Sequence, residues 1–322
     1  MGLTLVASLG CRSRDADRPG PPPNILLITV DTLRADKLGC YGSTLGATPN
    51  IDALAGQGVL FTRAYALAPW TLPSFASLLT SLPPPQHGAG GQMQKFTKLA
   101  PTVRTVAECF RIAGYLTASI VNVDFLTQPF GLTRGFAEVD FEAPAGKRDM
   151  IDGNLDVRDA TRTTDAAVAW MRQRAEKPFF LMVHFFDPHL VFAPPAEYRR
   201  RFAEPQDREN LDWIFGTQKQ IVAYRRGETT CDEATIHRAE ALYDGEVAYT
   251  DAQVGRLLAA LDALGLRERT IVVFTSDHGE EFLDHGGFEH GHTLYEELLH
   301  VPLVVRWPGK LSSAVVPQVV GL

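Results

Sequence analysis

Four polar side chains stand where they could do chemistry together: Asp31, Thr71, Asp277 and His278. Asp31 directly follows the apolar run ILLITV, Asp277 and His278 follow IVVFTS, and Thr71 precedes LPSFASLLT, whose proline marks a helix start. Two carboxylates, an imidazole and a hydroxyl suit one divalent cation. A cation on the Thr71 oxygen would lower its pKa and make it a nucleophile. The helix start would present backbone N–H groups to an anionic ester.

Each of these residues also has a structural interpretation. An aspartate after a strand is commonly a helix cap, and a threonine before a helix is commonly an N-cap. Asp277 and His278 side by side exceed what one cap requires. The convergence of all four therefore favours a site over four separate caps.

The elements that must position these residues follow from hydropathy. Continuous apolar runs are typical of strands covered on both faces by helices, and their alternation with helical segments predicts an α/β fold with a mostly parallel sheet. Polar residues just past the strand ends of such a sheet line the ligand crevice. The predicted strands are the run from Asn24 to Asp31, Leu116 to Val123, Pro178 to His184, Thr270 to Ser276 and Val301 to Arg306.

Helical spacing of apolar residues predicts three helices, over Thr48 to Gly56, Val103 to Ala113 and about Ala234 to Ala263. The segment from Tyr198 to Thr230 is charged and lacks periodicity. We expect it to be an irregular excursion over the surface of the sheet.

Composition excludes some classes of function. The net charge of −7 is spread along the chain without basic runs, which argues against nucleic acid as a partner. The four cysteines show neither the close pairing of a zinc site nor the density of a disulfide scaffold. They are Cys11, Cys40, Cys109 and Cys231.

The N-terminal segment MGLTLVASLGC resembles the lipobox of a bacterial lipoprotein signal and is followed by a proline-rich stretch that reads as a tether. No Lys or Arg precedes the apolar run, and Ser8 stands where that motif has an aliphatic residue. Two interpretations stay open: membrane anchoring through a lipidated Cys11, or a frayed terminus. The first predicts a bacterial cell-envelope or periplasmic location, and a cytoplasmic location remains the alternative.

Six ordered blocks of this chain resemble the successive signature blocks of the sulfatase family of the alkaline-phosphatase superfamily. They are NILLITVDTLRADKLGCYG, TPNIDALAGQGVLFTRAYA, WTLPSFASLLTSLPP, FFLMVHFFDPH, TIVVFTSDHGEE and HGHTLYEELLHVPLVVRWPG. The resemblance implies an α/β sandwich around a mixed, largely parallel sheet, completed by a smaller C-terminal subdomain. We expect residues 1–23 to be a lipoprotein signal and tether, and residues 24–322 to be a C-terminally truncated catalytic domain, either because the chain is a fragment or because the subdomain is absent.

The resemblance also implies roles for particular residues. Asp31, Asp277 and His278 match metal ligands, and Thr71 falls on the nucleophile, whose oxygen would also bind the metal. His189, in DPH, matches the histidine that contacts the substrate oxyanion or leaving group. Two positions where the family has substrate-contacting lysines hold His292 and, nearby, Asn122; the expectation is a catalytic contact from the first and substrate binding by the second.

Three departures from the family pattern change the expected chemistry. The block that normally begins with a cysteine or serine converted to formylglycine reads Thr71, Leu72, Pro73, Ser74, Phe75, so the aldehyde cannot form and its bracing arginine is missing. Thr32 replaces the second aspartate of the usual pair. We therefore expect no formylglycine and one divalent ion, Mn, Zn, Mg or Ca, with the softer ligand set favouring Mn or Zn.

These features predict a sulfatase-like ester hydrolase of the EC 3.1 kind that acts on sulfuric or phosphoric esters by two-step displacement through Thr71. The threonine resembles that of nucleotide phosphodiesterases and phosphoglycerol transferases, so phosphodiesterase or phosphotransferase chemistry is included. The expected partner is an anionic sulfate or phosphate ester of a sugar, lipid or small molecule. The alternative is a non-catalytic member that binds an anionic glycan or lipid headgroup.

The sequence indicates only weakly what three further histidines do. His285 and His290 lie in the glycine-rich DHGGFEHGH stretch, which predicts a mobile loop near the site. His184 is expected to pack at a strand end, with a contact to the site as the alternative.

Overall fold

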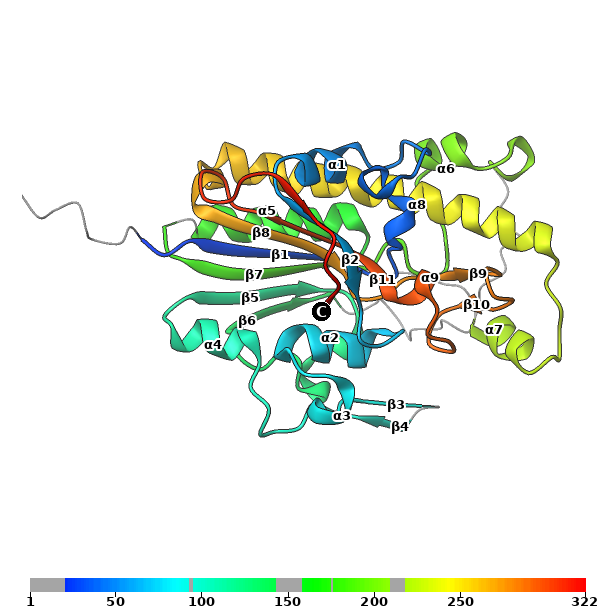
Figure 1. The fold of residues 1–322 in the computed structure, drawn as a ribbon, viewed down its shortest axis with the longest axis horizontal. Coiled ribbons are helices and arrows are strands. Elements are labelled where there is room, and N and C mark those ends of the chain that lie inside the picture. Colours follow the sequence, from blue (N-terminus) through cyan, green and yellow to red (C-terminus); the bar gives the residue numbers. More distant parts are fainter. Residues whose placement is uncertain (1–20, 93–94, 143–157, 175, 209–217) are drawn as a thin grey trace, which may run out of the picture.

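The computed structural model describes residues 21–92, 95–142, 158–174, 176–208 and 218–322. It centres on a nine-stranded sheet ordered β12-β2-β11-β8-β1-β7-β5-β6, with β13 also paired to β2 (Figure 1). Two short hairpins, β3-β4 and β9-β10, lie outside this sheet. The strands are β1 Asn24–Val30, β2 Val59–Tyr65, β3 Gly90–Gln92, β4 Lys95–Thr97, β5 Leu116–Val121, β6 Glu138–Phe141, β7 Phe179–Phe185, β8 Thr270–Ser276, β9 Glu281–Phe282, β10 Phe288–Glu289, β11 His300–Arg306, β12 Ala314–Val316 and β13 Val320–Gly321.

The centre of the sheet is parallel. β1 pairs in parallel with β8 on one side and β7 on the other, so that Ile28 lies opposite Phe274 and Val183. β11 is antiparallel to both of its neighbours, β8 and β2. All five predicted strands exist, and the mixed, mostly parallel sheet is confirmed.

Helices cover both faces of the sheet (Figure 1). Successive side chains of β1 point to opposite faces of the sheet, and both faces are apolar. Leu26, Ile28 and Val30 pack in one core with α1, α5 and α8, whereas Leu27 packs in a second core with α2 and α4. The helices are α1 Pro49–Gly56, α2 Thr71–Thr80, α3 Pro84–His87, α4 Val106–Ile112, α5 Ala160–Arg174, α6 Ala196–Phe202, α7 Gln218–Arg225, α8 Glu233–Ala263 and α9 Glu296–Leu299.

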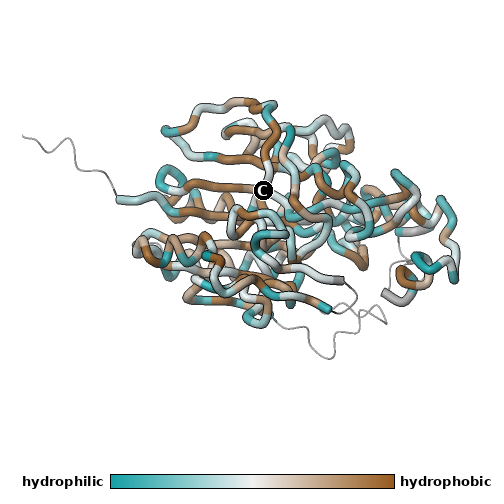
Figure 2. The backbone as a smooth tube through the Cα atoms, turned by 60° about the horizontal axis from the view of Figure 1, so that its bottom comes forward, coloured by the Kyte–Doolittle hydropathy of each residue, from teal (hydrophilic) through white to brown (hydrophobic). Residues whose placement is uncertain are grey.

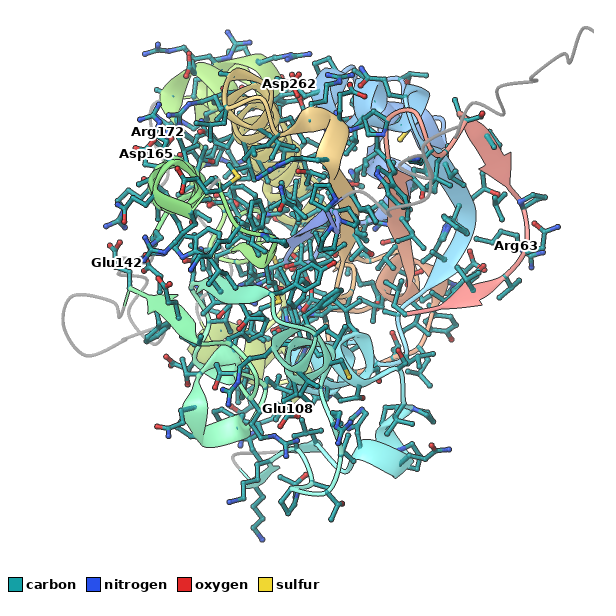
Figure 3. The ribbon with its side chains drawn as sticks, turned by 90° about the vertical axis from the view of Figure 1, so that its left-hand side faces the viewer. Arg63, Glu108, Glu142, Asp165, Arg172 and Asp262 are labelled. Carbon is teal, nitrogen blue, oxygen red and sulfur yellow. The ribbon has the colours of Figure 1, made fainter. Side chains whose placement is uncertain are left out.

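Hydropathy and charge follow this layering. Hydrophobic colour concentrates along the central strands (Figure 2), and labelled charged side chains such as Asp165 and Arg63 point outward (Figure 3). Because both faces of β1, β7 and β8 are covered, their residues are almost all buried. This is the physical reason for their continuous apolar runs.

The predicted helices are present with shifted ends. The second begins only at Val106, because Thr105 and Glu108 form a reciprocal capping box that sets its first turn. It ends before Gly114, whose φ of +87° favours glycine. The long helix α8 begins at Glu233, where the Asp232 side chain accepts a hydrogen bond from the Thr235 N–H.

The prediction of an irregular segment from Tyr198 to Thr230 was wrong in part. Helix α6 packs on α8, with the Tyr198 and Tyr249 rings 5.4 Å apart, and α7 lies further along the segment. Short helices with a single contacting face carry too few apolar residues to show a period. Residues 209–217 of the segment lie outside the described residues.

Residues 1–20, which include Cys11 and most of the predicted tether, also lie outside the described residues. Within the part of the chain that is described, no helix is both long enough and apolar enough to cross a membrane.

Candidate active site

Asp31 and Asp277 come together because they follow neighbouring parallel strands in register. Val30, the last residue of β1, lies opposite Ser276, the last residue of β8. The Ser276 hydroxyl accepts a hydrogen bond from the Leu33 N–H at 3.0 Å, which ties the segment after β1 to β8. The two carboxylates and the following His278 therefore emerge at the same edge of the sheet, as the sequence predicts.

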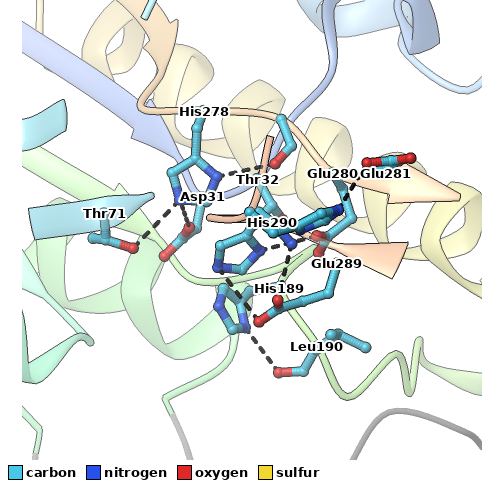
Figure 4. Close-up of polar contacts among 12 residues, drawn as sticks. Asp31, Thr32, Thr71, His189, Leu190, His278, Glu280, Glu281, Glu289 and His290 are labelled. Carbon is cyan, nitrogen blue, oxygen red and sulfur yellow. Dashed lines mark hydrogen bonds and ion pairs between the residues drawn. The ribbon is translucent and has the colours of Figure 1, made fainter. Parts of the chain in front are cut away.

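Helix α2 brings Thr71 to the same edge. Thr71 is the first residue of the helix, with Trp70 as its N-cap, and the Ser74 hydroxyl donates to the Asp277 carbonyl. The Thr71 Oγ1 lies 3.4 Å from Nε2 of His278 (Figure 4). In the first turn of α2 only Thr71 and Leu72 can offer backbone N–H groups to an anion, because Pro73 has none and the Ser74 N–H donates to the Trp70 carbonyl.

Asp31, Asp277 and His278 form a group that fits a divalent cation. Each offers a ligand atom within 4.8 Å of the others, and all three side chains are fully buried. Oδ1 of Asp31 and both carboxylate oxygens of Asp277 are buried and make no hydrogen bond. Buried carboxylate oxygens without partners are costly. A cation bound by these three residues would satisfy them, so the donor set fits the metal that the sequence predicts.

The protonation preferences of the group agree with this fit. Burial lowers the pKa of His278 to about 3, which keeps its imidazole neutral and able to bind a metal. Burial and the nearby charge of Asp31 raise the pKa of Asp277 well above its ordinary value. Burial acts on Asp31 in the same direction, but His189, His184 and His278 outweigh it and hold the pKa of Asp31 below its usual range.

The His184 side chain contacts the Asp31 carboxylate. Its Nε2 lies 3.3 Å from Oδ2 of Asp31, and its Nδ1 lies 3.0 Å from the Thr29 hydroxyl. Phe75, which stands where the family pattern has an arginine, packs edge-on against the His184 ring with 4.9 Å between centroids. Of the two interpretations of His184, the structure supports the contact with the site.

His189 and His290 complete the polar cluster (Figure 4). The His189 Nδ1 lies 2.9 Å from the Leu190 carbonyl, consistent with a donated N–H, and burial lowers the pKa of His189. The His290 ring lies 4.4 Å from that of His278 and 5.1 Å from that of His189. His290 therefore lies beside the metal group, where the sequence offered only the weak signal of a glycine-rich loop.

Two glutamates lie beside His290: Glu280, which is buried, and Glu289, which is partly exposed. The His290 Nδ1 lies 2.9 Å from Oε1 of Glu280. Burial lowers the pKa of His290, but Glu289 and Glu280 outweigh burial and raise it to about 10. His290 is thus a buried cation directly beside the neutral His278.

His292 and Asn122 have other contacts. His292 Nε2 lies 2.9 Å from Glu281 Oε2, on the β9-β10 hairpin, and its Nδ1 lies 3.3 Å from Arg225. The Asn122 amide donates to the His184 carbonyl at 3.1 Å and to the Thr163 hydroxyl at 2.9 Å. Direct substrate contacts of His292 and Asn122 stay predictions.

Thr32 occupies the position of the missing second acid. It has a left-handed backbone with φ of 53°, and its hydroxyl is buried without a hydrogen-bond partner. Its carbonyl accepts the Tyr243 hydroxyl at 2.8 Å, which holds the turn after β1 against α8.

Comparison with protein families identifies the family to which this chain belongs. The family model described as Sulfatase matches residues 23–321. The chain belongs to the sulfatase family. The fold of this sulfatase-family chain is similar to that of a phosphonate monoester hydrolase of Agrobacterium radiobacter, with a TM-score of 0.71, 24% identity, and coverage of 93% of this chain and 71% of that one.

Two curated relatives of this sulfatase-family chain are similar over most of its length. It is 28% identical to human iduronate 2-sulfatase, over 90% of this chain and 60% of that protein. It is 26% identical to an N-acetylglucosamine-6-O-sulfatase of Bacteroides thetaiotaomicron, over 97% of this chain and 68% of that protein. The chain thus spans between about 60% and 70% of the length of these relatives.

Proposed function

We propose that this protein is a metal-dependent hydrolase of sulfate or phosphate esters in which Thr71 is the nucleophile. The observation that carries the proposal is the position of the Thr71 hydroxyl, 3.4 Å from His278 Nε2, beside three buried carboxylate oxygens without hydrogen bonds. A nucleophile, a cation-binding group and a helix N-terminus then meet at one point.

Asp31, Asp277 and His278 would hold the ion, which would lower the pKa of the Thr71 hydroxyl and neutralise charge on the ester. The Thr71 hydroxyl gives its proton to water as its oxygen attacks phosphorus or sulfur, and the bond to the leaving oxygen breaks. The pKa of His290 is raised to about 10, so its imidazolium donates a proton to the leaving oxygen, and His189, whose pKa is lowered by burial, lies beside it. Water then cleaves the threonyl ester and releases sulfate or phosphate.

Chemistry without formylglycine is supported by two residues. Threonine cannot yield the aldehyde, and Phe75 is fully buried in the core against His184, where it offers no charged group to the site. Threonine nucleophiles favour phosphoryl transfer, whereas the two curated relatives are named for the sulfated sugars on which they act. Both ester classes therefore belong in the substrate test.

The second candidate function is binding of an anionic glycan or lipid headgroup without turnover. The missing formylglycine residue and missing lysines favour it. The buried carboxylates around Thr71 argue against it, because their desolvation is costly unless a cation is bound.

A substrate panel with matched variants tests the proposal. Purified protein supplied with Mn²⁺ or Zn²⁺ should turn over at least one of an aryl sulfate, an aryl phosphate, a phosphodiester and a phosphonate monoester. Thr71→Ala should abolish turnover. Thr80→Ala is the matched control, since that hydroxyl lies at the other end of α2 and bonds to the Ala76 carbonyl of its own helix. Unchanged turnover in Thr71→Ala would refute the nucleophile, and stoichiometric metal binding without any turnover would favour the binding protein.

Membrane anchoring through a lipidated Cys11, in a bacterial cell envelope, also remains a proposal. Its support is the sequence MGLTLVASLGC. The intact mass of the mature protein made in a bacterial host tests it: a diacylglycerol-sized increase on an N-terminal cysteine is expected, and an unmodified N-terminus would overturn it.

A further inference from the structure

A second group of metal-ligating side chains lies outside the Asp31 site. It consists of Glu281 in β9, His285 in the turn before β10, and Glu297 in α9. One ligand atom from each lies within 4.8 Å of the others. The three residues come from a stretch of 17 positions that begins three residues after His278.

Both glutamates of this group are buried. Glu281 is 0% exposed and Glu297 is 8% exposed. Oε1 of Glu297 lies 2.7 Å from Nδ1 of His285, and Oε1 of Glu281 accepts the N–H groups of His285 and Gly287 at 3.1 and 2.7 Å. The loop thus wraps around the Glu281 carboxylate.

The charges of this group are not balanced by lysine or arginine. Among the described residues, the side-chain ion pairs of Glu281 and Glu297 are with His292 and His285 only. Two buried carboxylates within 4.8 Å repel each other, and an imidazole offsets that repulsion only while it is protonated. A divalent cation would offset it at any pH at which the imidazole is neutral.

The loop packs closely against the Glu281 carboxylate at Gly287. A Cβ at Gly287 would lie 2.7 Å from Oε2 of Glu281 and 2.2 Å from Nε2 of His292, so a larger residue there would force these side chains to move. The His285 side chain is 44% exposed and stacks on Tyr295 with 3.6 Å between ring centroids. An ion could therefore enter from solvent on the His285 side.

We propose that Glu281, His285 and Glu297 bind a second divalent cation. One imidazole nitrogen and carboxylate oxygens, with water in a remaining position, suit Zn²⁺, and Mn²⁺ would bind more weakly. The ion joins β9 to α9 and so fixes the hairpin that carries His290 to the Asp31 site. Its binding does not depend on the reaction proposed for Thr71.

Metal stoichiometry tests this site. Chelator-stripped full-length protein is titrated with Zn²⁺ alone, and bound ions are counted by native mass spectrometry and elemental analysis. The wild type should bind two ions per chain, and His285→Ala and Glu297→Gln should each bind one. His237→Ala is the matched control, because His237 lies exposed between Glu233 and Glu240 with both contacts at 3.5 Å, and it should still bind two.

Asp277→Asn separates the two sites. It should lose the ion at Asp31 and keep the ion at His285, so the double variant with His285→Ala should bind none. A wild type that binds a single ion, lost in Asp277→Asn and kept in His285→Ala, would overturn the second site and leave the first. A single ion lost only in His285→Ala would support the second site and count against the proposed active-site metal. Two ions retained in His285→Ala would overturn the ligand assignment.

Discussion

Replacing Asp277 with asparagine should change the stability of the protein in opposite directions with and without metal. Both Asp277 oxygens are buried without hydrogen bonds, and the carboxylate lies within 4.8 Å of a ligand atom of Asp31. At an effective dielectric constant of about 20, two unit charges at that separation repel by roughly 3.5 kcal/mol. Burial and this repulsion raise the pKa of Asp277, and at pH values at which Asp277 is nevertheless ionised, Asp277→Asn removes the repulsion from the metal-free protein.

The asparagine amide brings a smaller cost. A buried amide without a hydrogen-bond partner costs about 1–3 kcal/mol. The metal-free variant should therefore be about 0.5–2.5 kcal/mol more stable than the metal-free wild type. With metal present at 100 times its dissociation constant, the wild type gains about 2.7 kcal/mol and the variant loses most of that gain. The order of stabilities then reverses.

Thermal and urea unfolding at pH 8, in chelator and in Mn²⁺, measure both differences. To keep any ion at His285 from contributing, the comparison uses a His285→Ala background. Asp165→Asn is the control, because Asp165 is exposed on α5, at the outside of the molecule (Figure 3), and pairs with Arg256. The same metal-induced stabilisation in Asp277→Asn as in the parent would refute the assignment of Asp277 as a ligand.

Three further predictions concern other residues. Burial, with the charge of Asp159, raises the pKa of Asp187 to about 7. Because the folded pKa exceeds the unfolded value, the stability contribution of Asp187 is complete below about pH 4 and is lost as pH rises through about 7. Urea unfolding between these pH values should show a smaller loss of unfolding free energy in Asp187→Asn than in the wild type. An equal loss would contradict this. His290→Gln should lower kcat roughly 100-fold or more while metal binding at Asp31 persists, since the variant cannot supply a proton; steady-state rates at wild-type level would exclude that role. Thr105→Ala should cost about 1–2 kcal/mol in urea unfolding because it removes the capping box of α4, and no change would show that the cap contributes little.

Local patterns were enough to predict the strands that carry the site. β1, β7 and β8 are buried on both faces, so their sequences are mostly apolar, and the first carboxylate after each run stands at or just past the carboxyl end of the strand. Parallel neighbours place those ends at one edge, and so Asp31 and Asp277 could be assigned to one place without coordinates. The capping and glycine signals likewise located helix ends to within a few residues.

Helix α5 was missed for a local reason. Its buried face consists largely of alanine and threonine, including Ala160, Thr163, Thr164 and Ala167, so hydropathy shows little helical period. The antiparallel direction of β11 was also not predictable, because a single apolar run reads the same in either direction.

Which histidines reach the metal group was decided by tertiary structure. His290 and His292 stand two positions apart in a glycine-rich loop, yet His290 lies beside His278 and Glu280 whereas His292 turns to Glu281. His184 reaches Asp31 because β7 pairs with β1, a contact between residues 153 positions apart. Residue types and spacing determine which polar groups stand at strand ends. Which of these groups touch is determined only by the path of the chain between distant elements, because packing rather than local propensity sets the direction of a loop.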